Sequence, residues 1–143
     1  MKSRPLQLTI VGVVILVAVF ILMVKDKPQA AATGSSSALP QAQLDRAIQA
    51  GKPALAFYHS NSCDQCIIMI DIVEQVYPEF SKTVALVDVN VYDPENEALL
   101  RSARIQFIPT LVFYNAQGQA DTHVGVMEAG VLQTRLTELG GAQ

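Results

Sequence analysis

The stretch FYHSNSCDQC, residues 57–66, contains both cysteines of this 143-residue chain and decides its fold. Its first residues belong to the apolar run ALAFYHS, which begins at Ala54 and has the length of a buried strand. After Cys66, apolar residues recur at spacings of three and four as far as Phe80, which is typical of a helix. The sequence therefore predicts a strand that leads directly into a helix, with Cys63 at the start of that helix.

The two cysteines are spaced for disulfide exchange. At a helix amino terminus, free backbone amides and the helix dipole favour the thiolate, which is the attacking form of cysteine. Cys66 lies one turn deeper, where it can attack a mixed disulfide formed by Cys63 and release the partner. We therefore predict that Cys63 is the nucleophile and Cys66 the resolving thiol, with no cofactor besides their redox-active disulfide.

Two other uses of the cysteine pair compete with redox exchange. A structural disulfide that closes so short a loop would restrict the unfolded chain very little. A zinc site needs four ligands, and only His59 and His123 could join the two cysteines. Redox chemistry is the favoured interpretation, and no metal is expected.

The remaining predicted elements alternate between helix and strand. They are a helix over residues 40–50, a strand over 83–91, a helix over 94–104, two strands within 109–126 joined at 115–118, and a helix over 127–139. Gly140 and Gly141 are expected to end the last helix. Phe107 is expected in the core with the other aromatic residues of this part. The order predicts an α/β class, a mixed sheet with helices on both faces.

Residues 39–139 resemble the thioredoxin superfamily. The resemblance is carried by FYHSNSCDQC, by RIQFIPT at residues 104–110, and by Val124 with Gly125. It implies a thioredoxin fold in which Pro109 is cis and faces the cysteine pair. It also implies that Ile108 presents backbone groups to an extended substrate segment, with Ser62 and Gly125 as further substrate-binding residues.

The chain departs from the thioredoxin pattern around its cysteines. Ser62 stands where thioredoxins usually have tryptophan, and Asp64 with Gln65 replaces their usual Gly-Pro pair. Alignment also places Phe57 where the family has a buried acid, and Leu86 where the lysine partner of that acid would lie. The usual proton acceptor for the resolving thiol is therefore missing.

Two residues near the cysteines are candidates for tuning their pKa values. The Asp64 carboxylate suits a helix start but disfavours the neighbouring Cys63 thiolate, which tilts the pair toward donating electrons. By family resemblance, Ile108 before the cis proline tilts it the same way. His59 lies four residues before Cys63, so it could tune the thiolate or carry a proton in place of the missing acid, or it could simply pack in the core.

The amino-terminal residues predict a membrane anchor. Residues 6–24 carry no charge, and about 19 residues of helix span roughly 28 Å, close to the thickness of a bilayer core. Residues 1–5 form a short tail, residues 25–38 have the composition of a flexible linker, and residues 39–143 form the thioredoxin-like domain. A cleaved signal peptide is the competing interpretation, although the apolar run is long for one.

Charge and cysteine use bear on partners and location. Residues 39–143 carry six basic and twelve acidic residues, which argues against nucleic acid as a partner. Basic residues flank the apolar run on both sides with a slight bias toward a cytoplasmic amino terminus, and paired cysteines suit an oxidising compartment. We therefore expect a single-pass membrane protein whose domain lies on the extracytoplasmic side.

The predicted function is that of a membrane-tethered thiol-disulfide oxidoreductase. Its expected partners are protein thiols and disulfides, bound as extended peptide segments, and a membrane electron donor. A reductase of disulfides in exported proteins is favoured. The alternatives are a disulfide oxidase or isomerase, and a non-catalytic binding or assembly module with the same fold.

Overall fold

The structure is a computed structural model that describes residues 38–141. Its elements in chain order are α2 (Pro40–Gln49), β1 (Ala54–His59), α3 (Asp64–Val76), the short 3-10 helix η1 (Tyr77–Phe80), β2 (Ala85–Asn90), the 3-10 helix η2 (Pro94–Asn96), α4 (Glu97–Ser102), β3 (Thr110–Tyr114), β4 (Ala120–Val124) and α5 (Ala129–Gly141). Each helix and strand predicted between residues 40 and 139 is present.

The four strands form one mixed sheet in the order β2-β1-β3-β4. β1 and β2 run parallel, with Phe57 opposite Asp88, whereas β3 runs antiparallel to both β1 and β4. Thr110 at the start of β3 lies opposite Tyr58 near the end of β1. The residues just before β3 therefore lie at the same end of the sheet as the carboxyl end of β1, which leads toward Cys63.

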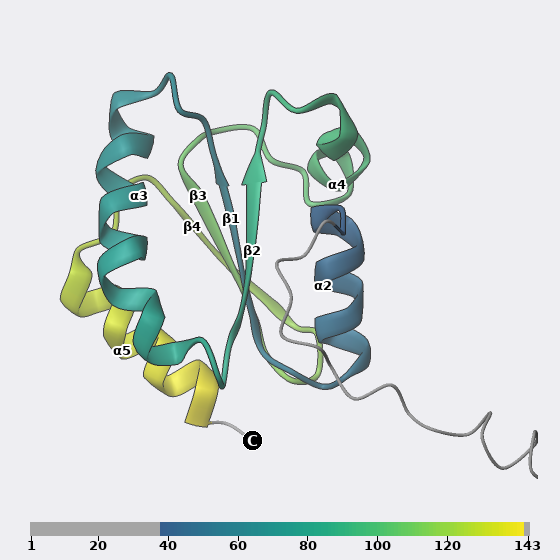
Figure 1. Cartoon of the computed structure of the whole chain (residues 1–143), viewed down its shortest axis with the longest axis vertical. Coiled ribbons are helices and arrows are strands. Elements are labelled where there is room, and N and C mark those ends of the chain that lie inside the picture. The colour runs from purple at the N-terminus through teal and green to yellow at the C-terminus, as the bar shows by residue number, and fades with distance from the viewer. Residues whose placement is uncertain (1–37, 142–143) are drawn as a thin grey trace, which may run out of the picture. The chain divides into compact units, whose positions relative to one another are not determined.

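Helices cover both faces of the sheet, as predicted: α3 and α5 lie over one face and α2 and α4 over the other (Figure 1). All six residues of β1 are buried, and its side chains alternate between the two sides. Two apolar clusters result. The cluster under α3 and α5 includes Leu55, Phe57, Met69, Leu111 and Leu132, and the cluster under α2 and α4 includes Leu44, Tyr58, Val87 and Leu99.

α3 ends two residues before a proline, whose ring does not fit inside a continuing α-helix. Pro78 follows in η1, and Tyr77 lies at the junction of the two helices. The Tyr77 hydroxyl donates to the carbonyl oxygen of Val84 at 3.0 Å and accepts from the amide of Leu86 at 3.1 Å. Within residues 38–141, β2 has a strand neighbour on one side only, so this side chain satisfies backbone groups on the open edge of the sheet.

The last helix continues past its predicted end. α5 includes Gly140 and Gly141, which the sequence analysis placed beyond it. A Cβ atom on Gly140 would lie 3.0 Å from Oγ1 of Thr83 and 3.5 Å from a methyl carbon of Val84. Glycine therefore lets α5 pack closely against the segment before β2, and at this position it serves a contact between elements rather than a helix stop.

The predicted membrane anchor at residues 6–24 lies outside the described residues, as do the tail at 1–5, almost all of the linker at 25–38, and residues 142–143. Among the helices of residues 38–141, none combines the length and the apolar composition needed to cross a bilayer.

Candidate active site

Cys63 is the residue that caps the amino terminus of α3. Its backbone is extended, with φ −117° and ψ 118°, and the helix begins at Asp64. The Cys63 sulfur accepts a hydrogen bond from the backbone amide of Cys66 at 3.3 Å. That amide is one of the donors that a helix leaves without a partner in its first turn, so a partial positive charge faces the sulfur. The position predicted for Cys63 is confirmed.

Cys66 lies one turn into α3 and is fully buried. Burial raises the pKa of the Cys66 thiol to about 11, a hydrogen bond with Cys63 adds to the rise, and a hydrogen bond from the backbone of Ser60 opposes it. Both cysteines are free thiols in this structure. At neutral pH Cys66 is therefore protonated, and it must lose a proton before it can act as a nucleophile.

Ser62 and Asp64 flank Cys63 and are exposed. The amide of Ser62 donates to the hydroxyl of Ser60 at 3.1 Å, which orders the turn between β1 and the helix. Asp64, the residue directly after Cys63, places an acidic side chain in the first turn of α3. Because this carboxyl is exposed, water and salt weaken its repulsion of negative charge on the sulfur.

The segment before β3 and the residue after β4 bring together three of the four residues expected to bind substrate. The Ile108–Pro109 peptide bond is cis, as the resemblance implied. The carbonyl oxygen of Pro109 accepts a hydrogen bond from the amide of Gly125 at 2.8 Å, which ties the loop to the end of β4. Gly125 has φ +98°, a conformation that favours glycine. Ile108, Pro109 and Gly125 therefore lie together at the end of the sheet where β1 ends.

Phe107 does not lie in the core, contrary to the sequence analysis. Its side chain is 66% exposed, and together with Val124, which is 55% exposed, it lines a shallow hollow of about 180 Å³. Its carbonyl oxygen accepts a hydrogen bond from the Thr110 hydroxyl at 2.7 Å, which ties the backbone of the loop to the start of β3. The signal that could have revealed this is its place directly before Ile108 and Pro109, in a loop expected to meet substrate.

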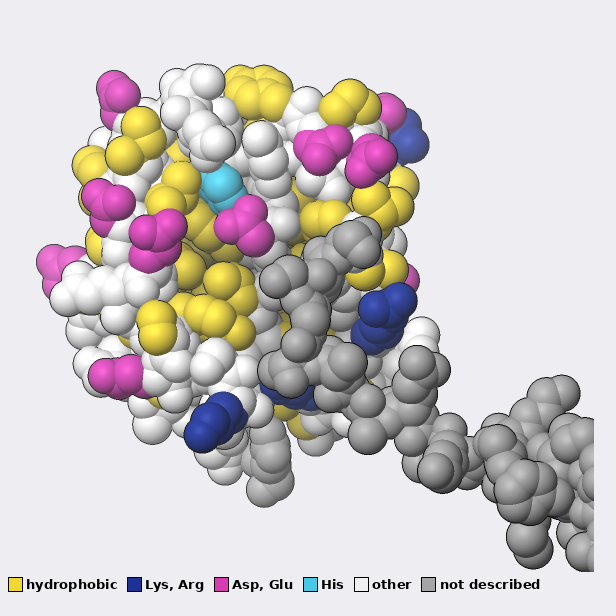
Figure 2. Space-filling view, in the orientation of Figure 1, with side chains coloured by type: hydrophobic (Ala, Val, Ile, Leu, Met, Phe, Trp, Pro, Cys, Tyr) yellow, Lys and Arg dark blue, Asp and Glu magenta, His cyan; other side chains and the backbone are white. Residues whose placement is uncertain are grey.

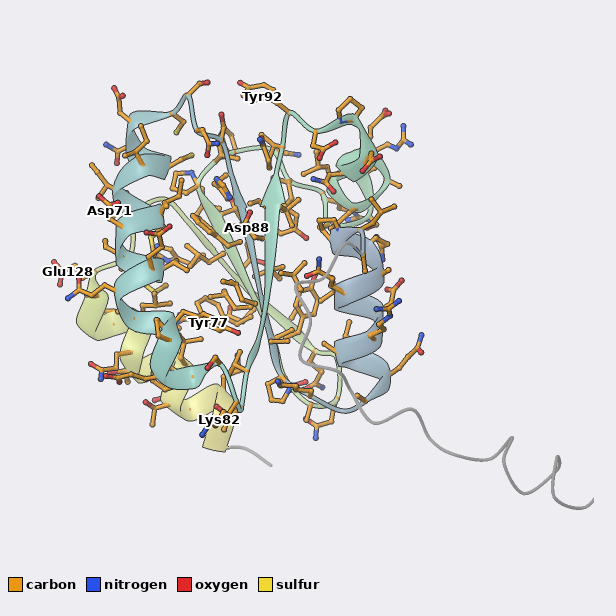
Figure 3. All side chains as sticks on the ribbon, viewed as in Figure 1. Asp71, Tyr77, Lys82, Asp88, Tyr92 and Glu128 are labelled. Atoms are coloured by element: carbon orange, nitrogen blue, oxygen red, sulfur yellow. The ribbon has the colours of Figure 1, made fainter. Side chains whose placement is uncertain are left out.

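His59 packs and also makes a specific polar contact. Its ring is buried, stacks on Phe57 with 4.6 Å between ring centres, and places Nε2 2.8 Å from Oδ1 of Asp88. Figure 3 shows Asp88 on the side of β2 that faces α3. The sequence analysis singled out His59 but missed Asp88, because the pairing of β1 with β2 brings the two together.

No group of three or more His, Cys, Asp or Glu side chains within residues 38–141 is placed to hold a metal ion. His123, the other histidine considered for a zinc site, lies on β4 with Nε2 3.5 Å from the carbonyl oxygen of Val126.

Comparison with known proteins bears on the family and the fold of this chain. Residues 40–140 match a family model described as a thioredoxin-like domain. A thioredoxin from Pyropia yezoensis is 24% identical over 86 residues, which cover 60% of this chain and 78% of that protein. A thioredoxin from Porphyra purpurea is 23% identical over the same length and the same shares of each chain.

Solved structures show the same likeness. Chloroplastic thioredoxin z superposes with a TM-score of 0.59 at 25% identity, over 71% of this chain and 90% of that one. Oxidized thioredoxin O2 from Arabidopsis thaliana superposes with a TM-score of 0.61 over 69% of this chain and 84% of that one. At 15% identity, the second likeness is one of fold alone.

Proposed function

Because this chain belongs to the family of thioredoxin-like domains and is a thiol-disulfide oxidoreductase, we propose that it reduces disulfide bonds in exported proteins from a membrane tether. One arrangement carries the proposal: a partly exposed cysteine at a helix start and a buried cysteine one turn behind it. In this arrangement the two thiols have different tasks, since only Cys63 is reached by a large partner.

The reaction takes two exchange steps. The Cys63 thiolate attacks one sulfur of the partner's disulfide, forms a mixed disulfide and releases the other sulfur as a thiolate. Cys66 then attacks the Cys63 sulfur, and the bond to the partner breaks with its electron pair on the partner's sulfur. Two electrons have passed to the partner, and Cys63 and Cys66 are joined by a disulfide that a membrane electron donor would reduce again.

The partner is proposed to bind as an extended segment against the loop before β3. Ile108 lies directly before Pro109 in this loop, and the neighbouring side chains of Phe107 and Val124 are apolar and exposed. Exposed apolar side chains beside an ordered backbone suit a partner that contributes backbone hydrogen bonds and a few apolar side chains. Ser62 and Gly125 would border the same segment.

The reducing direction is supported by Asp64. A thiolate that is strongly stabilised makes a dithiol reluctant to give up its electrons, which is the property of strong oxidants. A carboxylate next to Cys63 acts against that stabilisation, although its exposure limits the effect. The pair is therefore proposed to donate electrons rather than to introduce disulfides.

The membrane tether is proposed from the sequence of residues 6–24, with residues 25–38 as the linker and the domain on the extracytoplasmic side. About 13 flexible linker residues give a root-mean-square reach of roughly 20 Å. The domain would therefore meet its electron donor and its substrates close to the membrane surface.

The direction is tested by the reduction potential of the cysteine pair, measured on a chain beginning at Leu39 and equilibrated with glutathione or dithiothreitol buffers. A value near or below about −270 mV supports the reductase, and a value of about −120 to −180 mV would make the protein an oxidase or isomerase. In cells, a Cys66→Ala variant should accumulate mixed disulfides through Cys63. A binding module would instead keep its partners without any covalent link.

A further inference from the structure

A buried histidine and an exposed acid form a pair close to the cysteines. His59 ends β1, is 6% exposed, and places its Nε2 2.8 Å from the carboxylate of Asp88 on β2. A carboxylate only accepts hydrogen bonds, so the ring proton lies on Nε2. Figure 2 shows a histidine beside an acidic side chain on this face, where Figure 3 labels Asp88.

The second ring nitrogen of His59 is free to accept a proton. Nδ1 is buried and has no hydrogen-bond partner among residues 38–141. In the tautomer that the bond to Asp88 selects, Nδ1 carries a lone pair. Stacking on Phe57, with planes inclined by 23°, limits how the ring can turn. The protein therefore holds a buried, oriented and unpartnered base.

The proton that disulfide exchange must move starts near this base. Cys66 is fully buried in α3, the helix that covers the side of the sheet on which His59 stacks on Phe57, and the backbone of Ser60, the residue directly after His59, lowers the pKa of its thiol. A buried thiol reacts only after something takes its proton, and water reaches it poorly. The family's usual acid is replaced here by Phe57, which is apolar and 1% exposed.

We propose that His59 accepts the Cys66 proton at Nδ1 during release of the partner, and that Asp88 positions the ring and balances the charge it gains. The role rests on the proposed exchange reaction. The thiol proton moves to Nδ1, directly or through one water molecule, while the Cys66 sulfur bonds to the Cys63 sulfur. The bond from Cys63 to the partner breaks, its electron pair stays on the partner's sulfur, and that sulfur takes the proton back from the imidazolium.

The charged side chains named at this site come from β2 and α3. From β2, Asp88 bonds to the ring, and from α3, Glu74 lines the same hollow of about 310 Å³ as Asp88. From β3, the residue opposite Phe57 on this face is Leu111, which is uncharged. The hollow brings solvent to the Asp88 side of the pair, and Glu74 provides a matched control because it lies in the hollow without an observed bond to His59.

The test follows thionitrobenzoate release after the reduced full-length chain is mixed with excess Ellman's reagent. The chain has only two cysteines, so Cys63 releases the first thionitrobenzoate and the attack of Cys66 on the resulting mixed disulfide releases the second. The first phase depends on reagent concentration and the second does not, which separates the two steps. The wild-type chain, His59→Gln, Asp88→Asn and Glu74→Gln are compared from about pH 6 to about pH 10.5.

The expected result is a second phase slowed at least about tenfold near pH 7 in His59→Gln and severalfold in Asp88→Asn, with the first phase unchanged and Glu74→Gln like wild type. The deficit should shrink toward pH 10.5, where hydroxide can take the thiol proton. A second phase within twofold of wild type in His59→Gln overturns the proposal, and so does an equal slowing of both phases. A wild-type chain that forms no mixed disulfide would contradict the proposed function itself.

Discussion

Raising the pH should destabilise the reduced chain through Cys66. This side chain is fully buried, and burial raises its pKa from 9.0 to about 11. A group whose pKa is raised by folding stabilises the folded chain in full below its unfolded pKa of 9.0, and this stabilisation is lost as the pH rises to about 11. A rise of this size in pKa corresponds to roughly 2 to 3 kcal/mol in the free energy of unfolding.

The assay is urea unfolding of a reduced chain beginning at Leu39 and of its Cys66→Ala variant, at about pH 8 and about pH 11. Burial also raises the pKa values of Tyr77 and Tyr114, so both chains should lose some stability in alkali. The chain with Cys66 should lose about 2 to 3 kcal/mol more than the variant. Equal losses in the two chains would refute the link between the burial of Cys66 and its ionisation.

Three further substitutions test the core, the last helix and the acid beside the nucleophile. Phe57→Asp should lower the free energy of unfolding by about 4 kcal/mol or more, because it buries an unpaired carboxyl, and urea midpoints should show Phe57→Leu losing far less. In α5, Gly130→Ala meets no atom within 4 Å and should raise the melting temperature, whereas Gly140→Ala, whose Cβ meets a threonine hydroxyl at 3.0 Å, should lower it; equal shifts would contradict the packing described. Asp64→Asn should make iodoacetamide react about two- to fivefold faster with Cys63 at low salt, with a smaller gain at 1 M salt, and an unchanged or slower reaction would show that Asp64 does not disfavour the thiolate.

The order of strands and helices could be predicted because apolar spacing is a local property of the sequence. β1 reads as an uninterrupted apolar run and is buried along its whole length, and the cysteines lie at the predicted step from strand to helix. The end of α5 could not be predicted in the same way. Glycine is common just after the end of a helix, so Gly140 was expected to mark the end of this one. In the structure Gly140 lies within the helix, where Thr83, distant in the sequence, leaves no room for a larger side chain.

The parts of the site that the sequence did not reveal depend on contacts between elements. The pattern Val87, Asp88, Val89 predicts an exposed acid on a strand, and nothing local says that the neighbouring strand presents His59 to it. Phe107 is an apolar aromatic residue, as core residues often are, but it lies in a loop between α4 and β3 and its side chain is exposed. The register between β1 and β2 sets the contact of His59 with Asp88, and the geometry of the loop sets the exposure of Phe107.

The Tyr77 hydroxyl, which bonds to Val84 and Leu86 at the open edge of β2, has a consequence for how copies of this chain behave together. A bare strand edge is a template on which a second molecule can add its own strand, and such addition can spread into insoluble aggregates. Here a phenol takes the place of that added strand at the start of β2. Crowding many copies on one surface, as a membrane tether would, is then less hazardous, because this stretch of backbone is already occupied.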